Sequence, residues 1–129
     1  EQKSCSDRTG VKGNFLIIGI KWEPEDLRAR LRMRIDQMFS PELYQETKTL
    51  VQKYGWENGA MKSNIYKYAW RYLNQELTLE EAKEQSFYED WHLAKRQITW
   101  FKRNKQIIWL KLEDIYPYVI KYIHNEQTN

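Results

Sequence analysis

The residues best suited to chemistry lie at positions 95–103, in the order Lys-Arg-Gln-Ile-Thr-Trp-Phe-Lys-Arg. Lysine and arginine side chains bind phosphate groups, and an indole ring can stack on a nucleobase. At about 100° per residue of helix, Arg96, Trp100 and Arg103 share one face, and an apolar face beside them can pack. The pattern is typical either of an RNA-binding face or of a solvated helix end, where the helix dipole favours cations.

Two further groups of cations have both a structural and a functional interpretation. Arginines alternate from position 28 to position 34 and fan over a wide face of a helix. For these we expect a solvated face with ion pairs between neighbouring turns, in preference to contact with nucleic acid. The second group mixes cations and rings at a spacing that an ordinary packed helix also shows, and both interpretations stay open for it: Lys62, Tyr66, Lys67, Trp70 and Arg71.

Familiar enzyme signatures are missing from the sequence. It contains no G-x-x-x-x-G-K-[ST] phosphate loop. One cysteine and two histidines are too few for a credible metal site or a Cys-His nucleophile. The single Cys5 fits a reducing cytoplasm better than secretion, and no apolar run approaches the about 18 residues that cross a membrane. We therefore predict a cytoplasmic protein with no catalytic or metal-binding residue in this chain.

The chain of 129 residues is the size of one folded domain. Aromatic residues make up 15% of it, which is ample core material, whereas the net charge of +3 is only a weak argument for a polyanionic partner. Residues 1–14 are polar, and we expect a flexible leader there, followed by a single helical portion over residues 15–129. A first residue other than methionine suggests a piece of a longer protein.

Helical periodicity dominates the chain and predicts what holds the basic segment. Helices are expected to begin at Pro24 and Pro41, and another covers residues 63–73. A capping box of Thr78 and Glu81 opens the longest helix, which carries the basic segment in its last turns. Its buried side should follow one apolar stripe: Phe87, Trp91, Ala94, Ile98 and Phe101.

Two short apolar runs, at residues 15–20 and 107–112, predict strands, and a last helix is expected over residues 115–124. The inner face of that helix should consist of Tyr118, Val119, Tyr122 and Ile123. Two strands about ninety residues apart make only a marginal sheet by themselves. The predicted fold is therefore mainly α with two short strands, and its helices would pack on a sheet largely missing from this chain.

The literal order of residues 94–102 resembles, nearly residue for residue, the tRNA-contacting segment of tRNA dimethylallyltransferases. Weaker matches precede and follow it in the order of that family, at residues 16–19, 31–38, 77–82 and 109–110. The resemblance spans residues 15–112. It departs from the family at Ile65-Tyr66, where Gly-Tyr is usual, and at residues 40–43.

The resemblance implies the C-terminal part of a phosphate-loop α/β transferase. Such an enzyme transfers a dimethylallyl group from dimethylallyl diphosphate to the exocyclic amine of the adenine 3′ of a tRNA anticodon. In the family, a phosphate loop binds the diphosphate with Mg²⁺ and an Asp in a separate N-terminal motif acts on the amine; neither motif occurs in these 129 residues. The chain alone would be inactive, would bind no cofactor, and would help the missing N-terminal catalytic portion to hold the anticodon stem-loop.

Carried over residue by residue, the resemblance implies tRNA contacts at Lys95, Arg96, Gln97, Thr99, Trp100 and Lys102, and through a less close match at Lys62, Tyr66 and Lys67. The cations would meet phosphates or base edges, Gln97 and Thr99 would form hydrogen bonds, and Trp100 would pack or stack. One alternative is a non-catalytic RNA-binding or regulatory module derived from that family. Another is a helical interaction domain whose aromatic residues all belong to its core.

Overall fold

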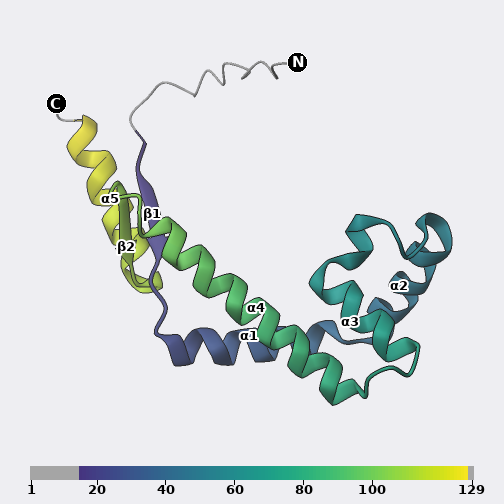
Figure 1. Cartoon of the computed structure of the whole chain (residues 1–129). Helices are drawn as coiled ribbons and strands as arrows, with labels where there is room; N and C mark the ends of the chain where they lie inside the picture. The colour runs from purple at the N-terminus through teal and green to yellow at the C-terminus, as the bar shows by residue number, and fades with distance from the viewer. Residues whose placement is uncertain (1–14, 128–129) are drawn as a thin grey trace. The chain divides into compact units, whose positions relative to one another are not determined.

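The computed structural model describes residues 15–127 (Figure 1). Backbone contacts divide the chain into two compact units. One contains Lys21–Asn104, and the other joins the strand before it to the residues that follow Asn104. The expected leader lies outside the described residues, and the single helical portion over residues 15–129 stays a prediction.

The Lys21–Asn104 unit is helical throughout its regular structure. Its elements are α1 (Pro24–Met38), α2 (Pro41–Tyr54), the 3-10 turn η1 (Gly59–Lys62), α3 (Asn64–Leu73) and α4 (Leu79–Phe101). Proline stands in the first turn of both α1 and α2, where its missing N–H costs no hydrogen bond. The helices predicted from the sequence are thus confirmed, with starts within one residue of those expected.

The core of this unit forms where α3 packs against both α2 and α4, and where α1 packs against α4. Ala69 on α3 and Ala82 on α4 have no exposed surface, because small side chains let neighbouring helices approach closely. Larger apolar side chains complete the core: Ile35, Phe39, Leu43, Tyr68 and Phe87. The first half of α4 is therefore fixed by packing.

The predicted capping box fixes the start of α4. The Thr78 hydroxyl accepts a hydrogen bond from the Glu81 backbone N–H at 3.2 Å, and the Glu81 carboxylate accepts one from the Thr78 N–H at 2.8 Å. The Glu81 carboxylate accepts hydrogen bonds from the Thr78 N–H and, at 2.9 Å, from the Thr78 hydroxyl, and these two bonds to its charged form lower its pKa. Two backbone donors that a helix start leaves unpaired are thereby satisfied.

The predicted apolar stripe of α4 is confirmed over most of its length and wrong at its end. Phe87 is buried, and Trp91, Ala94 and Ile98 are partly buried. Phe101, however, is 42% exposed. The side chains of α4 that belong to the core or pack against it end at Trp91, so the last turns extend beyond it.

The other unit contains β1 (Ile17–Ile20), β2 (Ile107–Leu110) and α5 (Leu112–Gln127). The strands are parallel, with Ile17 opposite Ile107 and Gly19 opposite Trp109. A Cβ atom on Gly19 would lie 2.7 Å from the Trp109 ring, so only glycine fits there. Both predicted strands are confirmed in shorter form, and so is a mainly α fold with two short strands.

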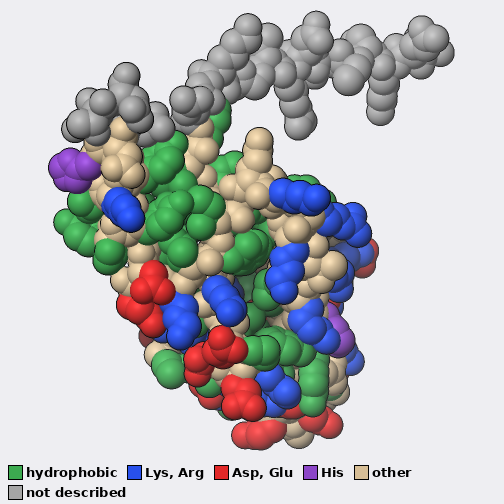
Figure 2. All heavy atoms as spheres, turned by 90° about the vertical axis from the view of Figure 1, so that its left-hand side faces the viewer, with side chains coloured by type: hydrophobic (Ala, Val, Ile, Leu, Met, Phe, Trp, Pro, Cys, Tyr) green, Lys and Arg blue, Asp and Glu red, His purple; other side chains and the backbone are tan. Residues whose placement is uncertain are grey.

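This unit leaves much of its apolar surface uncovered. None of its described residues is fully buried, and hydrophobic side chains gather on its exposed face (Figure 2). Ile123, expected to face inward, is 45% exposed, whereas Tyr118, Val119 and Tyr122 are partly buried as predicted. Other large apolar side chains are exposed on β1, on α5 and two residues before β1: Phe15, Ile17, Ile20, Leu112, Tyr116 and Ile120. Parallel sheets are normally covered on both faces, so this pair of strands lacks part of its core.

Candidate nucleic-acid interface

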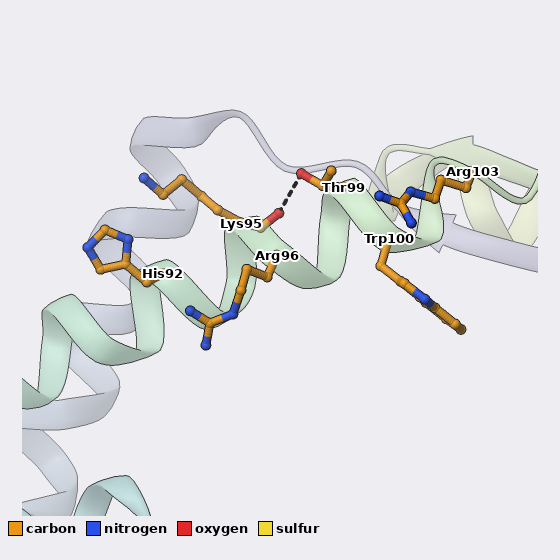
Figure 3. Close-up of a pocket in the computed structure, with 6 residues that line it drawn as sticks. All are labelled: His92, Lys95, Arg96, Thr99, Trp100 and Arg103. Atoms are coloured by element: carbon orange, nitrogen blue, oxygen red, sulfur yellow. Dashed lines mark hydrogen bonds between the residues drawn. The ribbon is translucent and has the colours of Figure 1, made fainter.

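The last turns of α4 carry a shallow groove of about 360 Å³ (Figure 3). Six side chains line it: His92, Lys95, Arg96, Thr99, Trp100 and Arg103. Successive members lie three or four residues apart in two rows, a spacing that places them on one side of a helix. Because α4 has no Gly or Pro in its 23 residues, this side is held by an uninterrupted helix.

Cations in and beside the groove have no carboxylate partner among residues 15–127. Within the described part of the chain, no carboxylate forms an ion pair with Lys95, Arg96, Lys102 or Arg103. Their charges are therefore available to an anionic ligand. Lys102 and Arg103 directly follow the last residue of α4, where the negative end of the helix dipole favours cations before any ligand binds.

Aromatic side chains border these cations. Trp100 is 64% exposed, and its ring meets Phe101 edge to face at 4.9 Å, which leaves indole surface open to a planar ligand. One turn earlier, the Lys95 ammonium lies 5.7 Å from the Trp91 ring. The Arg28 guanidinium of α1 approaches the same ring at 5.4 Å. Trp91 thus links a cation of the groove to α1 through two cation–π contacts.

The side chain of Thr99 is already engaged with its own helix. Its hydroxyl donates a hydrogen bond to the Lys95 carbonyl oxygen at 2.9 Å (Figure 3). Thr99 is exposed, so its oxygen can still accept a bond from a ligand.

The structure brings together some of the residues chosen from the sequence and leaves others outside the groove. Lys95, Arg96, Thr99 and Trp100 line it, whereas Gln97 and Lys102 are exposed but not among its lining residues. Sequence reasoning did not select His92 or Arg103 as contacts. Their signal was their spacing: His92 lies four residues before Arg96, and Arg103 lies four residues after Thr99.

The second basic group differs because its polar side chains already have acidic partners. Lys62 pairs with Glu57 at 3.0 Å and Lys67 with Glu89 at 2.7 Å. Burial is the largest single influence and lowers the pKa of the Lys67 ammonium, but the hydrogen bond to Glu89 and the charges of Tyr68 and Glu89 together raise the pKa overall. A phosphate that reached Lys67 would have to compete with this carboxylate.

The rings of the second group are also engaged. The Tyr66 hydroxyl donates a hydrogen bond to Glu46 at 3.1 Å. Burial and this bond raise the pKa of the Tyr66 phenol. Trp70 stacks on Trp56 with ring centroids 5.8 Å apart. These side chains stabilise the surface of α3 whether or not they touch a ligand.

Two of the arginines of α1 pair with carboxylates of another helix, so the expectation of ion pairs between neighbouring turns was wrong. Arg32 forms two hydrogen bonds with the Glu84 carboxylate on α4, at 2.6 and 3.2 Å. Arg34 lies 3.9 Å from Asp90, also on α4. Because α1 packs across α4, the nearest carboxylates belong to that helix. Spacing within α1 could not reveal them.

The described residues contain no group of three His, Cys, Asp or Glu side chains arranged to hold a metal ion. Among those residues there is also no helix with the length and apolar character needed to cross a membrane.

Comparison with known proteins identifies the family. The family model described as IPP transferase matches residues 1–104. The chain belongs to the IPP transferase family. Its curated relatives include the tRNA dimethylallyltransferase of Pelotomaculum thermopropionicum, 39% identical over 102 residues, which are 78% of this chain and 32% of that protein. The enzyme of the same name from Halalkalibacterium halodurans is 31% identical over 126 residues, or 97% of this chain and 40% of that protein.

Solved structures of IPP transferases agree with this assignment. The full-length tRNA isopentenylpyrophosphate transferase from Bacillus halodurans matches with a TM-score of 0.76 and 28% identity, over 91% of this chain and 40% of that one. The corresponding protein from Staphylococcus epidermidis has the same TM-score and identity over 85% of this chain. The chain spans 32% to 40% of the length of these relatives and matches their C-terminal part. The family predicted from the sequence is thereby confirmed, and the tRNA contacts of residues 94–102 stay a prediction.

Proposed function

We propose that this chain is the tRNA-binding C-terminal portion of a tRNA dimethylallyltransferase. The whole enzyme would transfer a dimethylallyl group from dimethylallyl diphosphate to the exocyclic amine of the adenine 3′ of the anticodon. The observation that carries the proposal is the groove of α4, where cations without a carboxylate partner in the described residues border the exposed ring of Trp100. Because the relatives of this chain are named tRNA dimethylallyltransferases, we infer that the anionic ligand is tRNA.

Each group of side chains then has a role in holding the anticodon stem-loop. Lys95, Arg96 and Lys102 bind phosphates or base edges, and Gln97 and Thr99 form hydrogen bonds. Trp100 stacks on an unpaired base, which is worth about 1–3 kcal/mol where stacking occurs. Anticodon loops suit such a surface because their unstacked bases can reach protein side chains.

The chemistry of transfer belongs to the missing N-terminal portion. This chain contains no phosphate loop, and its described residues offer no cluster of carboxylates for Mg²⁺. We therefore assign no step of the reaction to it and expect the cytoplasmic enzyme to need the other portion for dimethylallyl diphosphate and Mg²⁺. The uncovered apolar side chains of β1 and α5 support a partner of this kind, because a larger sheet would cover them.

Binding to a fluorescent anticodon stem-loop tests the RNA-binding half of the proposal. Anisotropy should show binding that weakens steeply as salt rises. No binding of the whole chain at low salt would refute the proposal.

Transfer from labelled dimethylallyl diphosphate tests the catalytic half. The chain alone should transfer none, and addition of the N-terminal portion of a relative should restore modification of the stem-loop. Activity of the chain alone would refute the division of labour. Binding without any restored transfer would instead favour a non-catalytic RNA-binding module.

The second basic group would extend the interface through Lys62, Tyr66 and Lys67. Glu89→Gln tests this part, because it removes the carboxylate that pairs with Lys67. RNA affinity at low salt should rise as the freed ammonium reaches a phosphate, while the protein loses up to about 1 kcal/mol of stability. Unchanged affinity would remove Lys67 from the interface.

A further inference from the structure

The single proton of the Thr99 hydroxyl is committed to the protein. The Lys95 carbonyl oxygen, 2.9 Å away, can only accept a hydrogen bond, so the hydroxyl must be the donor. What Thr99 presents to the groove is therefore an oxygen that accepts. Its neighbours there present the opposite chemistry, because lysine and arginine side chains donate only.

Because the cations donate hydrogen bonds and Thr99 accepts them, they bind different groups of an RNA strand. Phosphate oxygens carry no proton at neutral pH, so they pair with Lys95, Arg96 or Arg103 and not with Thr99. A phosphate could engage Thr99 only if the hydroxyl turned away from the Lys95 carbonyl. The ribose 2′-hydroxyl and the exocyclic base amines do carry protons and can donate to the Thr99 oxygen without disturbing that bond.

The position of Trp100 indicates that a base and its ribose, and not only a phosphate, would lie near Thr99. Its ring is exposed and lines the same groove as Thr99, one residue away. A base stacked on that ring would place its ribose or its edge in the groove that Thr99 also lines.

We propose that Thr99 and Trp100 form a nucleoside subsite, in which Trp100 stacks on a base and Thr99 accepts a hydrogen bond from a 2′-hydroxyl or an exocyclic amine. The adjacent cations hold the phosphates. The subsite rests on the RNA-binding function proposed above and deepens it. In this subsite Thr99 recognises a ribose or a base, whereas the cations of the groove bind phosphates.

The test replaces the hydroxyl of Thr99 by a methyl group in Thr99→Val. Thr49→Val is a matched control, because the exposed Thr49 on α2 makes the same bond to the carbonyl four residues earlier, also at 2.9 Å, and does not line the groove. Three stem-loops are compared by anisotropy. One is unmodified, one has 2′-deoxy nucleotides in its loop, and one has a loop of uridines and purine ribosides, which lack every exocyclic amine.

Thr99→Val should bind the unmodified stem-loop about fivefold more weakly, the loss of one neutral hydrogen bond, and Thr49→Val should bind it like the wild type. On the stem-loop that lacks the responsible donor, wild type and Thr99→Val should bind alike, which identifies the donor. Wild-type affinity of Thr99→Val for unmodified RNA, or an equal loss on all three ligands, would overturn the subsite while leaving RNA binding intact. No binding by the wild type would instead refute the RNA-binding function itself.

Discussion

Arg96→Ala should change how steeply RNA binding falls with salt, and not only how tight the binding is. Four exposed cations, Lys95, Arg96, Lys102 and Arg103, have no carboxylate partner in the described part of the chain. If each neutralises one phosphate, at about 0.7–0.9 per contact, log K falls with log salt at a slope of about −3. Removal of one contact reduces the slope to about −2.

These slopes give a measurable difference. From about 50 to about 200 mM salt the wild type should lose about sixtyfold in affinity and Arg96→Ala about fifteenfold. Lys102→Ala should behave like Arg96→Ala, and both should unfold within about 0.5 kcal/mol of the wild type, because an exposed side chain without a partner adds little stability. Lys48→Ala removes an exposed cation of α2 as a control and should keep the wild-type slope.

Anisotropy titrations at four or more salt concentrations give the slope directly. A parallel shift of Arg96→Ala at every salt concentration would mean that Arg96 neutralises no phosphate. A reduced slope for Lys48→Ala would show that the slope reports net charge and not this groove. A fall in melting temperature in step with affinity would make Arg96 a structural residue.

The remaining predictions concern stability. Gly19→Ala would place a Cβ atom 2.7 Å from the Trp109 ring and should cost about 1–3 kcal/mol, measured as faster hydrogen exchange in β1 and β2. Gly59→Ala is its control, because a Cβ there meets nothing within 4 Å, and equal effects of the two changes would contradict the packing argument. The hydrogen bond from Arg32 lowers the pKa of Glu84, so the stability that this pair gives is present above the ordinary value of 4.5 and is lost as the pH falls through the lowered one. In urea unfolding, Glu84→Gln should therefore cost up to about 1 kcal/mol at pH 7, since both side chains are over 40% exposed, and progressively less as the pH falls below 4.5. A cost that did not fall with pH would refute this assignment.

The features predicted best from the sequence are those that residues adjacent in the chain determine, such as the starts of helices. Pro24, Pro41 and the Thr78–Glu81 box mark helix starts through local backbone chemistry, and the structure has helices at all three places. Phe101 and Ile123 were expected to face inward because periodicity reports a shared face, whereas burial depends on what packs against that face. Both side chains lie in the last turns of their helices and are exposed.

The candidate site shows the same division between local and distant information. Helical spacing placed Arg96, Trp100 and Arg103 on one face, and Arg103 indeed lines the groove. The partners of other cations could not be predicted, because Lys67 and Glu89 meet across two helices and are 22 positions apart. Whether a lysine of this surface has a carboxylate partner or can bind a ligand is decided by the packing of α3 on α4.

The pairing of β1 with β2 bears on the order in which the chain folds. Joining Ile17 to Ile107 closes a loop of about ninety residues, at an entropic cost of about 4 kcal/mol before any contact repays it. The packing of α2 on α3 and of α3 on α4 joins helices adjacent in sequence, so these contacts form over short loops. During synthesis, Lys21–Asn104 can therefore fold before β2 leaves the ribosome, and the strands pair last. By the same reasoning, the strand pair should be the first part to open and be cut by proteases in the finished protein.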